Sequence, residues 1–211
     1  SHPRERAARE LELERALVGK ISAHQRFMLA NLLTQLDFLD EQIGEVDTRM
    51  EAILTQLPPF QEAVRLLDTI PGVSRQLAIL IVAEIGVDMS RFPSDRQITA
   101  WAGVAPGNHE TGGKQRSGKA RQGNKHLQRG LVLAAHAAAT SKHNYLRAMY
   151  HRLSARRGKA RAAVAVGRTI LQAAYFMLKR GEAYHDLGEN YLDQLDRTHT
   201  TKRLVKRLQA S

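Results

Sequence analysis

The sequence predicts an all-α protein, in which a long N-terminal helical arm precedes a compact helical domain. Apolar residues recur at helical spacing along most of the chain, and no segment alternates convincingly between apolar and polar residues as a strand does. The length of 211 residues allows one ordinary domain with an appendage, or two small domains. We expect an arm at residues 1–58, a helical domain at 59–181, and a tail with a short basic helix at 182–211.

The arm is predicted from one strict apolar repeat. Nine apolar residues follow one another at spacings of three and four: Leu29, Leu32, Leu36, Leu39, Ile43, Val46, Met50, Ile53 and Leu57. This period of about 3.5 residues, with charged residues between, indicates a coiled coil whose narrow seam packs on another helix. Because the flanks are polar, self-association into a dimer or higher homo-oligomer is favoured over packing on a preceding helix at residues 5–20. Pro58 and Pro59 end the arm.

Capping and breaking residues divide the following domain into short helices. The expected helices cover about residues 61–69, 74–85, 94–103, 125–141, 144–156 and 160–180. Gly86 and Gly181 are typical helix stops, and Ser94 with Gln97 has the spacing of a capping box.

The turn between the first two of these helices resembles a helix-hairpin-helix, a motif of DNA repair and recombination proteins. Pro71 and Gly72 supply the turn, with apolar residues on both sides. In that motif the turn and the N-terminus of the second helix point backbone amides at a phosphate. Gly72, Val73 and Ser74 are therefore candidate nucleic-acid contacts. The alternative is an ordinary turn in which Pro-Gly only reverses the chain.

Charge is strongly segregated along the chain, which carries a formal net charge of +11. Residues 111–181 contain sixteen Lys and Arg and no acidic residue, whereas residues 36–69 contain eight acidic and two basic residues. A solvated helix face usually explains a charge run, but a run this long without counter-charge favours a phosphate-binding surface. Cysteine is absent, which excludes disulfides, thiolate metal sites and cysteine nucleophiles. Without a membrane span or a signal-peptide pattern, we expect a cytoplasmic protein with nucleic acid, and no membrane, as its partner.

The loop at residues 104–126 brings glycines, cations and hydroxyl groups together. Its cations alternate with glycines and are Lys114, Arg116, Lys119, Arg121 and Lys125. Glycine lets a backbone approach a phosphate chain, and the cations neutralise that chain. In this setting the hydroxyl of Thr111 or Ser117 is a candidate nucleophile for phosphoryl transfer. Residues 113–119 have Walker A spacing, but Ala120 replaces the magnesium-binding Ser or Thr, which argues against an ATPase.

Several separated stretches together resemble one protein family. They are LDTIPGV at 67–73, AEIG at 83–86, AGVAPGN at 102–108, ETGGK at 110–114, GNKHL at 123–127, YHRL at 150–153, ARRGK at 155–159 and AVGR at 165–168. Through them, from about residue 21 to about residue 196, the chain resembles the C-terminal part of bacterial transposases of the insertion-sequence 110/116/902 family.

The resemblance implies a recombinase that cuts and rejoins DNA without ATP, as an oligomer held by the arm and associated with the bacterial nucleoid. In related members a structured guide RNA directs the choice of target and donor. Family members divide catalysis between an N-terminal ribonuclease-H-like domain, whose acidic residues bind Mg²⁺, and a hydroxyl nucleophile of the C-terminal domain. The sequence has no counterpart of that N-terminal domain, so we expect no metal site here and no activity from this chain alone.

The family's nucleophile position corresponds to Thr111, where members usually have Ser. Thr keeps the hydroxyl but adds a methyl group that crowds in-line attack, so Ser117 remains the second candidate. Expected phosphate contacts beside them are Lys114, Arg116, Lys119 and Arg121, with Asn124 and His126 as helpers, and further contacts at Lys125, Arg152, Arg156, Arg157 and Lys159. The competing hypotheses are a non-enzymatic dimeric nucleic-acid-binding module and an RNA-binding assembly factor.

Overall fold

The computed structural model describes residues 19, 21–106, 109–111, 114–117, 122–195, 197 and 201, with residues 109–111 and 114–117 described by their backbone. The chain divides into two compact units, residues 1–56 and 57–211. Every regular element in the described ranges is a helix except one pair of short strands, so the predicted all-α class is confirmed. Nearly all of the helix expected at residues 5–20, and of the basic helix expected in the tail, lies outside the described residues.

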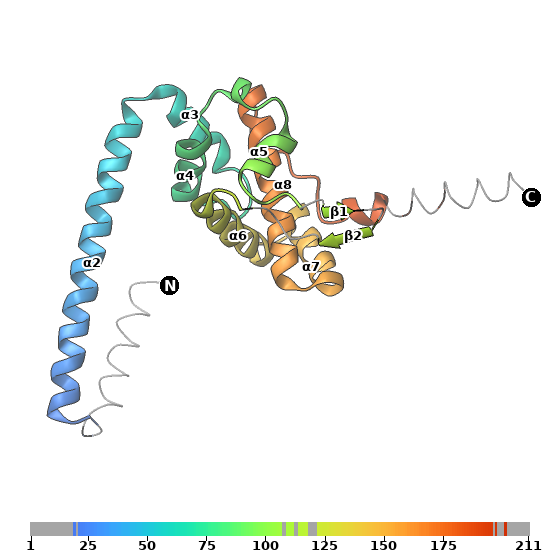
Figure 1. Cartoon of the computed structure of the whole chain (residues 1–211). Coiled ribbons are helices and arrows are strands. Elements are labelled where there is room, and N and C mark those ends of the chain that lie inside the picture. The colour runs from blue at the N-terminus through green and yellow to red at the C-terminus, as the bar shows by residue number, and fades with distance from the viewer. Residues whose placement is uncertain are drawn as a thin grey trace, which may run out of the picture. The chain divides into compact units, whose positions relative to one another are not determined.

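The described part of the first unit is one helix, α2 (Ala23–Thr55) (Figure 1). Ser22 and Gln25 form a reciprocal capping box at its start, which satisfies two backbone amides there. The helix ends before Pro58, as the sequence predicts. The apolar seam is open to solvent in the single chain, with Leu36 56% and Ile43 59% exposed. An apolar stripe this long on a lone helix is typical of a surface that packs on another helix.

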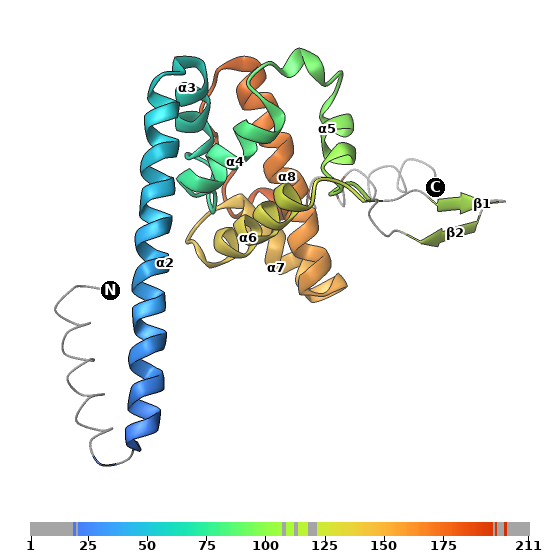
Figure 2. The same ribbon diagram turned by 60° about the vertical axis from the view of Figure 1, so that its left-hand side comes forward.

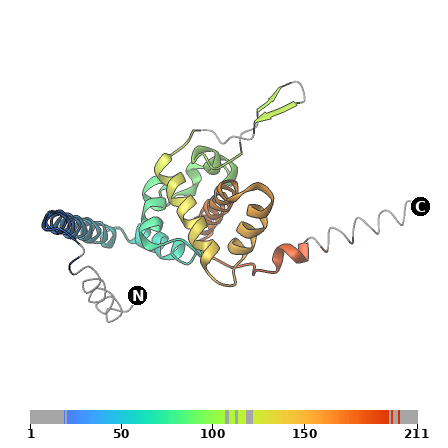
Figure 3. The same cartoon turned by 90° about the horizontal axis from the view of Figure 1, so that it is seen from below.

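The second unit is a cluster of helices around α8 (Lys159–Arg180) (Figures 2 and 3). Its other helices are α3 (Pro58–Leu67), α4 (Arg75–Ile85), the short 3-10 helix η1 (Met89–Arg91), α5 (Asp95–Trp101), α6 (Lys125–Thr140) and α7 (Tyr145–Arg157). Helix α8 contacts α3, η1, α5, α6 and α7. The core forms because α8 buries apolar side chains such as Val166, Ile170 and Leu171 on several faces.

Local sequence explains where these helices begin and end. Pro58 is the first residue of α3, a position where its missing amide hydrogen is not needed. The hydroxyls of Ser74 and Ser94 cap α4 and α5, respectively. Gly86 and Gly181 follow α4 and α8 with positive φ angles of 74° and 69°, a conformation that glycine adopts readily.

The loop between α5 and α6 contains a β-hairpin, which was not predicted from the sequence. Strands β1 (His109–Thr111) and β2 (Lys114–Ser117) pair in antiparallel register, with an irregularity between His109 and Glu110. Thr111 pairs with Lys114, so only two residues connect the strands, and both are glycines. A two-residue Gly-Gly connection is typical of a tight β-hairpin.

Candidate nucleic-acid interface

The predicted phosphate-binding turn between α3 and α4 is held against α6. Gly72 has φ +86°, and a Cβ atom built there would lie 2.5 Å from the backbone nitrogen of Ala138. Val73 is buried, and its N–H donates to the carbonyl of Ile70 at 3.0 Å. Ser74 is exposed, and its Oγ accepts from the Leu77 amide at 3.3 Å. Gly72 therefore lies against α6, and the predicted contacts of Gly72, Val73 and Ser74 with phosphate stay a prediction.

The two ends of the hairpin-bearing loop are fastened together. A Cβ atom built on Gly123 would lie 2.5 Å from the carbonyl carbon of Ala102, so the two backbones touch. Gln128 Nε2 donates to the Gly103 carbonyl at 3.1 Å. Residues 102–103 and 123–128 thus form a closed base for the hairpin-bearing loop.

Asn124, predicted as a helper in phosphate binding, has a structural role at this base. Its Oδ1 accepts from the amides of His126 and Leu127, at 3.1 and 3.0 Å, and so caps α6. Its Nδ2 donates to Glu84 Oε2 at 2.5 Å, which ties α6 to the end of α4. Both ends of the amide are thus used inside the protein, and Glu84 and Gln128 are anchoring residues that the sequence reading missed.

The strand register separates the two candidate nucleophiles. Thr111 ends β1 and pairs with Lys114, while Ser117 ends β2 and pairs with His109. They therefore occupy different strands and opposite ends of the paired segment. Lys114 and Arg116 belong to β2, whereas the predicted contacts Lys119 and Arg121 lie outside the described residues.

Exposed cations occupy helix starts, where the helix dipole disfavours them. Lys125, which is followed by the exposed side chain of His126, opens α6, and Lys159 opens α8, while the first turns of both helices contain no acidic residue. The positive end of a helix dipole repels a cation by roughly 0.3–1 kcal/mol. Helix stability therefore does not explain these residues, whereas an external anion would be favoured by both the cations and the dipole.

The junction of α7 and α8 brings three predicted contacts together. Arg156 and Arg157 end α7, Lys159 begins α8, and all three are exposed. Gly158 between them provides no side-chain cap for α8. Among the described residues, no side-chain cap is thus found for the first turn of α8, which lies beside three cations, an arrangement suited to a phosphate.

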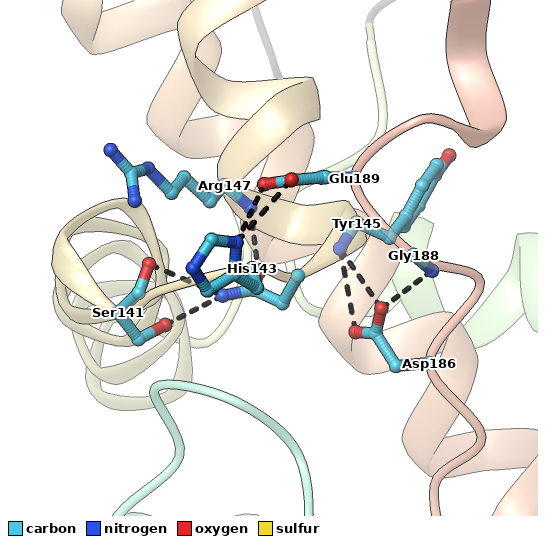
Figure 4. A network of polar contacts seen from close by, with 8 residues as sticks. Ser141, His143, Tyr145, Arg147, Asp186, Gly188 and Glu189 are labelled. Atoms are coloured by element: carbon cyan, nitrogen blue, oxygen red, sulfur yellow. Dashed lines mark hydrogen bonds and ion pairs between the residues drawn. The ribbon is translucent and has the colours of Figure 1, made fainter.

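Residues 111–181 contain no acid of their own, but acidic residues after α8 reach back to the start of α7 and to the residues before it. Asp186 accepts from the amides of Tyr145, at 3.1 Å, and Gly188, at 2.6 Å (Figure 4). Glu189 lies 3.3 Å from the His143 ring nitrogen. These acids lie just beyond residue 181 in the sequence, so the segregation of charge along the chain is less complete in the folded unit.

Arg152 is the predicted contact that this acidic segment engages. Its guanidinium lies 3.6 Å from the Asp193 carboxylate. Together with Ala148, Glu189, Leu192 and Asp193 it lines a groove of about 380 Å³. Arg152 therefore differs from Arg156, Arg157 and Lys159 in having an acid beside it, and its contact with nucleic acid stays a prediction.

The acidic segment is anchored at its beginning as well. The amide of Tyr184 donates to Thr69 Oγ1 at 3.0 Å. Burial, together with the neighbouring Asp186 carboxylate, raises the pKa of the Tyr184 phenol well above its usual value. The phenol therefore stays neutral at physiological pH, as expected for a side chain that fixes the segment in place.

The described ranges contain no group of three or more His, Cys, Asp or Glu placed to hold a metal ion. The ligand set for Mg²⁺ that the resemblance implies is thus not found among these residues. None of the helices in the described ranges is both long enough and apolar enough to cross a membrane.

Comparison with known proteins shows that the sequence of this chain is similar to those of transposases. Residues 64–151 match the model of the transposase IS116/IS110/IS902 family. The chain is 28% identical over 172 residues to the transposase for insertion sequence element IS1111A of Coxiella burnetii, an alignment that covers 78% of this chain and 45% of that protein. It is 31% identical over 111 residues to a probable family 20 transposase of Pseudomonas aeruginosa, covering 52% of this chain and 31% of that protein.

A third relative is the pilin gene-inverting protein of Moraxella bovis, which is 22% identical over 147 residues, covering 68% of this chain and 45% of that protein. The chain thus spans less than half the length of these relatives, which fits the expected C-terminal part. The family match covers the α3–α4 turn, the hairpin-bearing loop and α6, where most of the predicted site residues lie. Through residues 64–151, the chain matches the model of the transposase IS116/IS110/IS902 family, and it is similar to part of the curated transposases of that kind.

Proposed function

We propose that this chain is the DNA-binding part of a transposase, and that it supplies the hydroxyl nucleophile for DNA strand cleavage and rejoining. The observation that carries the proposal is the placement of exposed cations at the starts of α6 and α8, where they oppose the helix dipole. The match of residues 64–151 to the model of a transposase family supports the same function. A structured guide RNA is a second phosphate polymer that this surface would bind by the same contacts.

The hairpin is the proposed source of the nucleophile. Thr111 stands beside the two-glycine connection and pairs with Lys114. A hydroxyl attack on phosphorus builds negative charge on the non-bridging oxygens, and a neighbouring cation stabilises that charge. In the proposed step the hydroxyl oxygen of Thr111 bonds to the phosphorus, the leaving strand keeps the oxygen of the broken ester bond, and the hydroxyl proton passes to a base or water. Ser117 remains the second candidate.

Reversing the charge of Lys159 tests the DNA-binding proposal, because the change should raise the stability of the fold and lower its affinity for DNA. Lys159→Glu should stabilise the fold by about 0.3–1 kcal/mol, because an acid at a helix start complements the dipole. The same change should weaken binding of duplex DNA about tenfold, because a phosphate contact becomes repulsive. Thermal unfolding and fluorescence anisotropy measure the two effects.

Lys179→Glu is the matched control, since it makes the same charge change in the last turn of the same helix. It should lower stability, because the dipole favours a cation there, and leave DNA binding within about twofold of the original. Equal losses of affinity in the two variants would show a response to net charge alone and would contradict the proposed surface.

The exposed seam of α2 is the proposed contact between copies of the chain. Replacing Leu36 and Ile43 together with Glu should convert a dimer or higher oligomer into a monomer, because buried like charges oppose the packing of the seam. Phe38→Glu is the control, since Phe38 is 58% exposed but lies off the seam. Sedimentation velocity measures the result. A monomeric original chain, or equal dissociation by Phe38→Glu, would contradict the contact.

A further inference from the structure

Arg168 is a cation of the second unit that neither the family match nor the predicted contacts include. It lies near the middle of α8, and its side chain is partly buried. Its Nε atom is buried, and within the described part of the chain it has no hydrogen-bond acceptor. A buried donor on a charged group is costly without an acceptor, and arginine is always protonated at physiological pH. The Arg168 guanidinium therefore has a hydrogen-bond donor that lacks an acceptor among the described residues.

Two contacts locate this guanidinium relative to α5. Tyr175 Oη donates to the Phe92 carbonyl at 3.1 Å, and Gln172 Nε2 donates to Asp95 Oδ2 at 2.5 Å. The two segments thus run in opposite directions: the earlier residue of α8, Gln172, meets the later residue, Asp95, and Tyr175 meets Phe92. Figure 2 shows the two helices beside each other. Arg168 precedes Gln172 by one helical turn on the same face of α8, so it lies toward the end of α5.

The end of α5 is where the hairpin-bearing loop leaves the helical cluster. The loop base at residues 102–103 and 123–128 follows α5 and precedes the body of α6. Arg168 is thus placed on the side of the cluster from which the hairpin with Thr111 extends. A phosphate held there would lie in the part of the unit that also carries the proposed nucleophile.

Local charge leaves Arg168 without an acidic partner on the helices that form this face. Asp95 is the one acidic residue of α5, and it accepts from Gln172. Helices α6, α7 and α8 contain no acidic residue. Arg161, two turns earlier on the same face of α8, is exposed and adds a second positive charge. Arg161 and Arg168 thus place two positive charges on this face, and the Asp95 carboxylate lies one helical turn further along it.

We propose that Arg168 is a phosphate-binding residue that holds a phosphodiester of bound nucleic acid at the base of the hairpin-bearing loop. This inference rests on the proposed function, and it adds a contact that positions the backbone relative to the hairpin. The planar guanidinium suits the task, because it can donate two parallel hydrogen bonds to one phosphate. The buried Nε is fixed by the packing of α8, so little side-chain freedom is lost on binding.

The test combines nucleic-acid binding with stability in Arg168→Met and Arg168→Lys. Affinities for a labelled short DNA duplex and a labelled RNA hairpin are measured between about 50 and 200 mM KCl, and thermal unfolding is followed without nucleic acid. Arg168→Met should weaken binding about tenfold or more and make the salt slope shallower by about one, the value for one lost phosphate contact. Its melting temperature should stay equal or rise, because the unsatisfied donor is removed. Arg168→Lys should keep the slope and lose less affinity.

Arg180→Met is the matched control, because it removes the same side chain from the other end of α8, where the guanidinium lies over the Phe176 ring. It should leave the salt slope unchanged. The affinity loss of Arg168→Met in the DNA arm, the RNA arm or both identifies the polymer that supplies the phosphate.

A lower melting temperature of Arg168→Met with unchanged affinity would overturn the inference, because Arg168 would then be a packing residue. If binding by the original chain depends steeply on salt but all variants bind equally well, the role of Arg168 would be overturned. The proposed function would not be affected by that result. Salt-independent or absent binding of both polymers by the original chain would overturn the proposed function, and the inference with it.

Discussion

Gly72→Ala is expected to destabilise the second unit by roughly 3 kcal/mol or more. Gly72 has φ +86°, where a Cβ atom is unfavourable, and the added atom would meet the backbone of α6 at Ala134 and Ala138. Backbone atoms cannot rotate away as a side chain can, so α6 or the turn must shift. The loss should appear as a lower melting temperature, by about 2–4 °C for each kcal/mol.

Gly188→Ala separates the two causes of this effect. Gly188 has a similar φ of +83°, but nothing lies within 4 Å of the Cβ position. Its alanine variant should lose only about 1–2 kcal/mol, the cost of the left-handed conformation. If Gly72→Ala melted no lower than Gly188→Ala, the close contact between the turn and α6 would be wrong.

Thr111→Ala is expected to abolish the covalent protein–DNA adduct in the full-length transposase supplied with Mg²⁺ and its cognate nucleic acids. Removing the attacking hydroxyl should lower the rate by at least about a thousandfold, because neither binding nor neighbouring cations can replace the nucleophile. Thr111→Ser should form the adduct at least as fast as the original, since it removes only the crowding methyl group. Denaturing electrophoresis of labelled DNA measures the adduct.

Ser117→Ala is the comparison for this experiment, because Ser117 is the other hydroxyl candidate and occupies the opposite strand. It should retain the adduct within about tenfold of the original rate. Loss of the adduct in Ser117→Ala with persistence in Thr111→Ala would transfer the nucleophile role to Ser117. No adduct in any full-length protein would favour the non-enzymatic binding module.

The helices were predictable because their ends are set by local chemistry. Pro58, Ser74, Ser94 and Gly181 each impose or stop a helix through their own backbone or hydroxyl group. Periodicity alone predicts α2, since its apolar residues repeat without interruption. These signals need no knowledge of which helix packs on which.

The parts that sequence reasoning missed depend on contacts between distant residues. The bond between Asn124 and Glu84 joins positions 40 residues apart, and Asp186 reaches an amide of α7 from 41 residues away. Arg168 is notable only because its Nε is buried without an acceptor, which no spacing rule reveals. The hairpin could have been predicted, because Gly112 and Gly113 stand next to each other between two short polar segments, as in a two-residue hairpin turn. The other glycines and the cations of the loop made the segment look like an irregular phosphate-binding loop instead.

The salt dependence of DNA binding by the unmodified chain shows whether residues 111–181 form a phosphate-binding surface. Association constants for a short duplex are measured by fluorescence anisotropy at several KCl concentrations. We expect the logarithm of the association constant to fall linearly with the logarithm of the salt concentration, with a slope of about −4 or steeper, as for several phosphate contacts. A slope near zero, or no binding at low salt, would contradict it.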